Sequence, residues 1–186
     1  MILPIYALGQ PVLKKVAVDI QPDYPDIEQL IANMWETMYN AQGVGLAAPQ
    51  IGLSIRLFII DTTEIGKDAP QHSGFKRAFI NAHKVEERGT PWSYEEGCLS
   101  IPDIRGDVDR QPELVLRYMD EQFKEHVETF TGINARVIQH EYDHIDGILF
   151  TELLKPLKKQ LIRRKLEYIK QGKISSDYRM KFLPRK

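Results

Sequence analysis

The segment His140-Glu141-Tyr142-Asp143-His144 constrains the fold and the chemistry of this chain more than any other segment. Residues four apart in an α-helix project from one face, so a helix here directs both imidazoles toward one metal ion. Glu141 follows the first imidazole and lies within reach of a water molecule at that metal. Three polar side chains on one turn have little value for packing, so we interpret the segment as a metal-binding helix.

The single cysteine offers a third ligand. Cys98 lies 42 positions before His140, in a loop-like segment bounded by Gly97 and Pro102. Two imidazoles and one thiolate leave a fourth position open for water, as in catalytic rather than structural metal sites. A thiolate suits Fe(II), Zn(II) and Co(II), and the sequence does not choose among these ions. The other histidines have no ligand spacing, and two of them are expected at the surface: His72 and His126.

A glycine-rich segment, Gly43 to Gln50, is a candidate for stabilising an oxyanion. Gly43 and Gly45 allow the backbone to approach a ligand closely, and the neutral amide of Gln50 can donate a hydrogen bond without competing for the metal. The same residues also fit a simpler interpretation, in which a helix ends at Gly43 and a turn follows.

Composition indicates a soluble cytoplasmic protein. With 186 residues the chain is long enough for one domain with a substantial core, and we expect residues 1–186 to form it. One cysteine excludes an internal disulfide and fits a reducing compartment. No apolar run is long enough to cross a bilayer, and no signal peptide is visible at Met1–Ile5. A net charge of −1 gives no general attraction to nucleic acid, so we expect neither a membrane partner nor a specific DNA partner.

The order of predicted elements favours an α+β fold. Apolar spacing predicts a helix over Asp26–Gln42, with Asp26 as its cap, and a buried strand follows over Ser54–Asp61. Weaker strands are expected at Phe75–Ile80 and around Val85, after a polar surface loop over Thr62–Gly74. Later elements are a hairpin, the motif helix, a second long helix and a tail without predicted structure: 114–119 with 125–130, 132–143, 153–171 and 174–186. We therefore expect antiparallel sheets packed around a central metal-binding helix, with an N-terminal and a C-terminal helix.

Three segments together resemble the motifs of peptide deformylases. The motif G-x-G-x-A-A-x-Q matches Gly43–Gln50, E-G-C-L-S matches Glu96–Ser100, and Q-H-E-x-D-H-x-x-G matches Gln139–Gly147. The order and spacing are those of the family, and the resemblance extends over essentially the whole chain. Two departures are Ile145, where leucine is commoner, and Arg136, where some members have an aliphatic residue that lines the methionine pocket.

The resemblance implies removal of the formyl group from the N-terminal formyl-methionine of newly made polypeptides. It implies that Fe(II) is the expected metal, with Zn(II), Ni(II) or Co(II) as possible substitutes. The implied metal ligands are Cys98, His140 and His144; the implied catalytic groups are Glu141 as general base and then acid, with Gln50 and the backbone N–H of Leu99 at the oxyanion. The implied substrate-binding residues are Val44, Gly45 and Gly97, along which the peptide adds a strand, and Arg105, which falls where a family arginine lies beside the substrate cleft.

The predicted C-terminal helix carries an excess of positive charge. Residues 155–165 hold six basic residues and no acidic one, so the rest of the chain is net negative. Similar enzymes dock on the ribosome through such a helix, and we consider the ribosome a candidate partner beside the formyl-methionyl nascent peptides. The alternative is a helix face that is simply solvated.

Two other functions are compatible with the metal motif. One is an H-E-x-x-H endopeptidase, although its usual third ligand is histidine or glutamate rather than the thiolate present here. The other is a deformylase-like domain that binds metal or ribosome without turnover. Cleavage of internal peptide bonds would support the first, and an intact metal site without hydrolysis would support the second.

Overall fold

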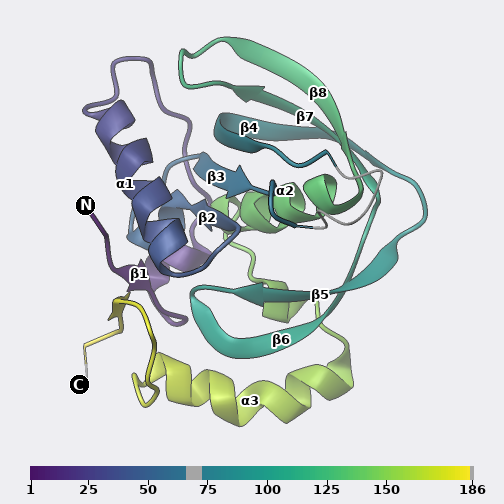
Figure 1. Ribbon diagram of the computed structural model, residues 1–186. Helices are drawn as coiled ribbons and strands as arrows, with labels where there is room; N and C mark the ends of the chain where they lie inside the picture. The colour runs from purple at the N-terminus through teal and green to yellow at the C-terminus, as the bar shows by residue number, and fades with distance from the viewer. Residues whose placement is uncertain (66–72, 185–186) are drawn as a thin grey trace.

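The computed structural model describes residues 1–65 and 73–184, and it has the expected α+β architecture (Figure 1). The elements in chain order are β1 (Ile5–Tyr6), η1 (Pro11–Lys14), α1 (Ile27–Asn40), β2 (Gly45–Ala47), η2 (Ala48–Ile51), β3 (Leu57–Asp61), β4 (Lys76–Arg88), β5 (Trp92–Cys98), β6 (Ile101–Arg110), β7 (Glu113–Met119), β8 (Glu125–Thr131), α2 (Gly132–Ile145), η3 (Phe150–Glu152), α3 (Pro156–Lys170) and β9 (Met180–Lys181). Most of the loop expected over Thr62–Gly74 lies outside the described residues.

Two antiparallel sheets lie on opposite sides of α2 (Figure 1). The larger has the strand order β2-β3-β4-β7-β8, and the smaller is the β5–β6 hairpin. Helix α3 runs along the outer side of this hairpin, and its Ile162 and Ile169 are buried in the same cluster as Ile104 and Val108 of β6. The fold class predicted from the sequence is therefore confirmed, with one addition: β1 and β9 form a small parallel pair.

Helix α2 is central because the chain surrounds it. Its apolar residues Ala135, Ile138 and Ile145 are fully buried, in a cluster with Phe58 of β3 and Phe79 of β4. Its polar side chains are buried as well, including residues on several faces of the helix: Arg136, Gln139, Glu141, Asp143 and His144. Burying so many polar groups is costly unless each has partners. This helix is thus built around polar interactions rather than one apolar stripe.

The β-strands of the first half differ from the prediction in two respects. Residues around Phe75–Ile80 and Val85 form one long strand, β4, because its pairing with β7 shifts register at two bulges instead of breaking. Cys98 is the last residue of strand β5, whereas the sequence suggested a loop. The glycine and proline around it fit a strand edge here because β5 pairs only with β6 among the described strands.

The ends of α1 also differ from the prediction, although the helix itself is confirmed. Asp26 precedes it in a left-handed conformation and makes no side-chain capping bond. At the other end Gln42, rather than Gly43, takes the left-handed conformation with φ 55°. Gly43 is needed for space instead, since a Cβ there would lie 2.7 Å from Cδ1 of Leu99.

Candidate metal centre and active site

Three ligand groups from two separate elements converge beside α2. Cys98 ends β5, while His140 and His144 lie one turn apart on α2, and one ligand atom from each lies within 4.8 Å of the others. The Sγ of Cys98 is 3.3 Å from Nε2 of His144. Ligands of one tetrahedral ion at sulfur and nitrogen distances of about 2.3 and 2.0 Å are separated by roughly this much. The donor set therefore fits a divalent metal. Burial lowers the pKa of His144, which favours the neutral imidazole that metals bind.

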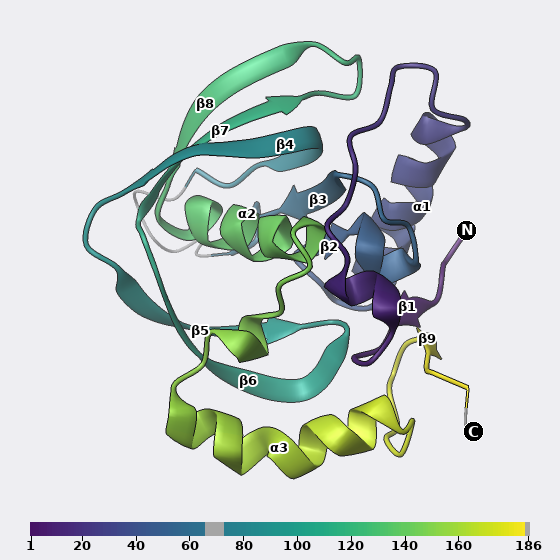
Figure 2. The ribbon, with the colours of Figure 1, turned by 180° about the vertical axis from the view of Figure 1, so that it is seen from behind.

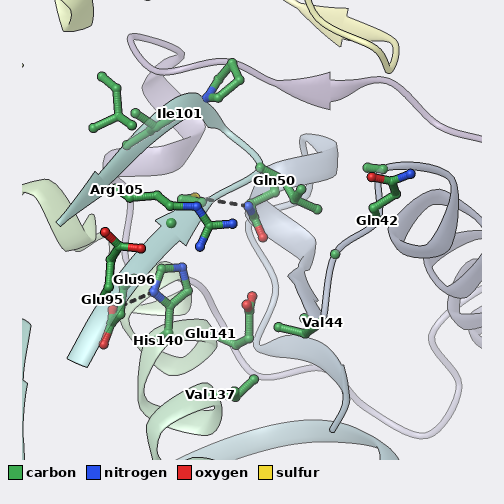
Figure 3. Close-up of a pocket in the computed structure, with 18 of the residues that line it drawn as sticks. Gln42, Val44, Gln50, Glu95, Glu96, Ile101, Arg105, Val137, His140 and Glu141 are labelled. Atoms are coloured by element: carbon green, nitrogen blue, oxygen red, sulfur yellow. Dashed lines mark hydrogen bonds and ion pairs between the residues drawn. The ribbon is translucent and has the colours of Figure 1, made fainter. Parts of the chain in front are cut away.

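A buried ionic network holds the first of these imidazoles. Oε2 of Glu96 lies 2.9 Å from Nδ1 of His140, which leaves the other ring nitrogen for the ligand cluster (Figure 3). Arg110 donates to both oxygens of Glu96 and also to Asp143, at 2.7–3.0 Å. Burial opposes ionisation of Glu96, but its hydrogen bonds with His140 and Arg110 hold its pKa well below the usual range. Such a carboxylate fixes the orientation and tautomer of a metal-binding histidine.

Arg136, which replaces the aliphatic residue of some family members, is a buried part of the site. The residue lies one turn before His140 and therefore on the same helical face. It is 2 % exposed, donates to Glu96 at 3.0 Å and to the carbonyl of Val108 at 2.7 Å, and stacks on Trp92. It also lines the cavity beside the proposed ligands, so a buried guanidinium paired with the Glu96 carboxylate forms part of the cavity wall.

The carboxyl group of Glu141 lies beside the ligand cluster and points into the cavity (Figure 3). The residue is 4 % exposed, and among the described residues its Oε2 has no hydrogen-bond partner. Burial raises its pKa to about 7. Gly45 on β2 makes room for this group, because a Cβ there would lie 2.4 Å from Oε1. An unpartnered carboxyl in such surroundings is suited to exchanging a proton with water.

The amide of Gln50 faces the same cavity from the opposite side (Figure 3). Its Oε1 accepts a hydrogen bond of 2.8 Å from the backbone N–H of Ala47, which fixes the orientation of the group. Its Nε2 is 3.5 Å from Sγ of Cys98 and 3.3 Å from Oγ of Ser100. The amide donor is thus held next to the ligand cluster. The alternative of a simple helix end and turn does not describe this segment, because Gly45–Ala47 forms strand β2 and Ala48–Ile51 forms the 3-10 helix η2.

The cavity has a volume of about 540 Å³ and lies between two free strand edges. Strand β2 is at the edge of the larger sheet, and β5 pairs only with β6 among the described strands. Val44 and Gly45 line the cavity from one side, and Gly97 and Arg105 line it from the other. Every site residue singled out from the sequence lines this cavity except His144, which is buried behind it in the ligand cluster.

Tyr178 also lines this cavity and was not singled out from the sequence. It belongs to the tail after α3, and its hydroxyl donates a 2.7 Å hydrogen bond to the carbonyl of Leu99. Burial raises the pKa of Tyr178, so the hydroxyl remains a protonated donor at neutral pH. No local pattern marks this tyrosine, because its connection to the site is through tertiary contacts.

The sequence of this chain also matches a known protein family. Residues 2–160 match the family model described as "Polypeptide deformylase". The chain belongs to the peptide deformylase family. The chain is 57% identical to a peptide deformylase of Flavobacterium johnsoniae, over 98% of this chain and 96% of the relative. It is 53% identical to one of Cytophaga hutchinsonii, over 98% of both.

Solved deformylase structures have the same fold. The structure of a peptide deformylase from Legionella pneumophila matches with a TM-score of 0.79 at 37% identity, covering 93% of this chain and 98% of the other. The peptide deformylase from Thermus thermophilus matches with a TM-score of 0.81 at 36% identity, covering 92% of this chain and 99% of the other.

Family membership decides among the three functions that the sequence left open. The chain is a peptide deformylase, a metalloenzyme that hydrolyses the formyl group from the N-terminus of newly synthesised polypeptides. The endopeptidase and the non-catalytic binding domain are not supported.

Within residues 1–65 and 73–184, no helix has the length and apolarity to cross a membrane.

Proposed function

We propose that Glu141 transfers the protons of the deformylation while Cys98, His140 and His144 hold a divalent metal. The observation that carries this proposal is the buried carboxyl of Glu141 beside three converging ligand atoms, with no partner for Oε2 among the described residues. When bound there, a divalent metal lowers the pKa of water toward neutrality and polarises the formyl oxygen. Residues of the chain carry out the proton transfers, the stabilisation of the oxyanion and the binding of the substrate.

Glu141 accepts the proton of the attacking water and later gives it to the departing amine. Attack on the formyl carbon forms one C–O bond, and the C–N bond then breaks to release formate and the free N-terminus. Nε2 of Gln50 and the backbone N–H of Leu99 donate to the oxyanion that develops between these steps. Gln50 is already oriented for this by its bond from Ala47.

The substrate binds as an additional strand between β2 and β5. Both strands present a free edge to the cavity, and backbone groups at Val44, Gly45 and Gly97 supply main-chain hydrogen bonds. Arg105 lines the cavity from β6 (Figure 3), and its guanidinium would contact the bound peptide there. The formyl carbon carries only hydrogen, so a tight site excludes the methyl group of an acetylated peptide.

The first experiment is formate release from formyl-Met-Ala-Ser by metal-quantified protein under anaerobic conditions, beside the acetylated peptide. We expect formate from the first peptide and no turnover of the second. Because one methyl group is worth only about 1–3 kcal/mol in a pocket, this selectivity also requires a rigid site. No formate from fully metallated protein would contradict the proposal.

The expected metal is Fe(II), with Zn(II), Ni(II) or Co(II) as substitutes. The thiolate of Cys98 and the two imidazoles suit these ions. An Fe(II) enzyme with a thiolate ligand is oxygen-sensitive, through oxidation of the metal or the thiolate. Activity should therefore fall in air for the Fe(II) form and persist for the Ni(II) form. Equal loss in air with both metals would contradict Fe(II)-dependent sensitivity.

The reaction takes place in the cytoplasm, and α3 is the surface that docks on the ribosome. The single free cysteine, Cys98, fits a reducing compartment, which supports the cytoplasmic location. Docking through α3 is supported by its exposed basic side chains, including Lys159 and Arg163. It is also supported by Leu157 and Leu161, each 69% exposed. Contacts with ribosomal RNA phosphates would make this binding fall steeply as salt increases.

Charge reversal tests this docking surface. The double variant Lys159→Glu/Arg163→Glu should bind ribosomes at least roughly tenfold more weakly in co-sedimentation, with unchanged deformylation of the free tripeptide. A matched double variant on other exposed surfaces, Lys15→Glu/Lys124→Glu, should bind normally. Binding that is insensitive to salt, or equal in both double variants, would exclude α3 as the docking surface.

A further inference from the structure

The turn that follows the cysteine ligand has an unusual need for external support. Cys98 pairs with Ile101, so Leu99 and Ser100 form a two-residue connection between β5 and β6. Two-residue hairpins favour primed turns, which need positive φ at one or both central residues. Neither Leu99 nor Ser100 is among the described residues with positive φ. The local backbone therefore does not stabilise this turn in the usual way.

Three segments distant in sequence supply the support. The hydroxyl of Tyr178 donates to the carbonyl of Leu99 at 2.7 Å, and the N–H of Leu8 donates to the carbonyl of Ser100 at 2.9 Å. The side chain of Gln50 adds a contact with Oγ of Ser100 at 3.3 Å. Both carbonyl groups of the turn thus accept hydrogen bonds from the two ends of the chain.

The two ends are themselves joined, so that they act together. Strand β1 pairs in parallel with β9, and the N–H groups of Ile5 and Ala7 donate to the carbonyls of Arg179 and Lys181 at 2.9 and 3.0 Å. Figure 2 shows this pair beside the two termini, on the outside of the molecule. Tyr178 lies two residues before the paired Met180, which fixes its backbone close to the turn.

We propose that Tyr178 is a positioning residue for deformylation, which holds the Leu99–Ser100 turn so that the Leu99 N–H meets the oxyanion. This inference rests on the role proposed above for that N–H. Tyr178 lies beyond residue 160, where the family match ends, so the function is assigned to a segment that the family model does not describe. The side chain acts through Leu99, because its hydroxyl is directed to the carbonyl of that residue.

The test compares Tyr178→Phe with Tyr168→Phe. The first keeps the ring and removes only the hydroxyl that bonds Leu99, whereas the second removes the exposed hydroxyl of α3 that accepts from Arg164 at 2.8 Å. Metal content, kcat and KM for formyl-Met-Ala-Ser are measured for both variants and the native enzyme. Hydrogen–deuterium exchange of the peptide that contains residues 98–101 gives a readout independent of turnover.

We expect Tyr178→Phe to lose about two- to tenfold in kcat, as for one hydrogen bond, with KM and metal content unchanged. Amide exchange at residues 98–101 should accelerate in this variant, and Tyr168→Phe should match the native enzyme in every measurement. An unchanged kcat, a loss confined to KM, a loss that follows metal content, or an equal loss in Tyr168→Phe would each overturn the proposal. An inactive native enzyme would instead contradict the function proposed above.

Discussion

Gly45 leaves the space that the carboxyl group of Glu141 occupies. A Cβ at this position would lie 2.4 Å from Oε1 and 2.7 Å from Cδ of Glu141, so Gly45→Ala must displace the carboxyl group. A shift of about 1 Å in a catalytic group can cost about 100-fold in rate, and we expect kcat to fall by this order. The measurement is kcat per bound metal ion.

Gly132→Ala is the control for a simple loss of stability. Gly132 has φ +56°, so alanine is strained there, but its Cβ would meet nothing within 4 Å. This variant should lose about 1 kcal/mol of folding free energy and keep the native kcat per folded molecule. A Gly45→Ala enzyme with native kcat would show that Glu141 does not need its present position.

The carboxyl of Glu141 is also tested directly. Glu141→Ala removes the proposed proton carrier and leaves all three proposed ligands in place, so the metal content should not change. Loss of a general acid–base group reduces turnover by roughly 10²- to 10⁴-fold. Parallel metal analysis and formate assays would check this, and near-native turnover would assign the proton transfer to another group.

Cys98→Ser should affect metal retention before anything else. A serine oxygen is a harder and weaker donor than a thiolate for Fe(II) or Zn(II), so the ion dissociates more readily. We expect a large loss of bound metal after dialysis against buffer without metal, measured by atomic absorption. If the variant retained a full equivalent, Cys98 would not be a ligand.

Among the elements, strands β4, β7 and β8 are linked by one partly buried ionic cluster. Tyr118 donates to Glu128 at 2.7 Å, and Arg77 donates to both Tyr118 and Glu128. Burial opposes ionisation of Glu128, but the hydrogen bonds from Tyr118 and Arg77 lower its pKa below 4.5. The cluster therefore connects three neighbouring strands by a carboxylate that must be ionised.

This cluster predicts an acid-dependent contribution to stability. A carboxyl with a lower pKa in the folded state stabilises the protein above its unfolded pKa of 4.5, and this stabilisation is lost as pH falls through the folded pKa. Because the Glu128 side chain is 38% exposed, the contribution should be below about 1 kcal/mol. Urea unfolding of native protein and Glu128→Gln should differ most near neutral pH and converge in acid, below the folded pKa; a constant difference would exclude the ionised carboxylate as its cause.

At the scale of the whole molecule, a metal at the proposed site would connect parts of the fold that are far apart in the chain. Its proposed ligands come from the end of β5 and from α2, which are separated in sequence by β6, β7 and β8. A metal that binds only the folded state stabilises it by RT ln(1 + M/Kd), where M is the concentration of free metal and Kd its dissociation constant.

Metal removal should therefore lower the melting temperature. For a chain of this size, loss of an ion present at about 100 times its dissociation constant corresponds to about 5–10 °C. Differential scanning calorimetry with and without a chelator measures the shift, which should reverse when the metal is returned and be much smaller in Cys98→Ser. An identical melting temperature in both conditions would show that the ion does not couple β5 to α2.

Local sequence patterns predicted the elements with strong periodicity. The helix α1, the strand β3, the β7–β8 hairpin and the motif helix α2 all lie where apolar spacing and turn residues placed them. They could be predicted because their signals repeat within a few residues. Strands β5 and β9 could not: β5 is mostly polar with one buried residue in seven, and β9 has only two residues.

The sequence by itself determined which chemistry to expect of this protein, because the helical spacing of His140 and His144 and the single thiolate predict a set of metal ligands. Only the tertiary structure decided how that chemistry is supported. It placed Arg136 and Arg110 around Glu96, made Gly45 the space for Glu141, and brought Tyr178 to Leu99, 79 positions away. The physical reason is that ligand spacing is set by the geometry of one helix turn, whereas these supports depend on where distant segments meet after folding.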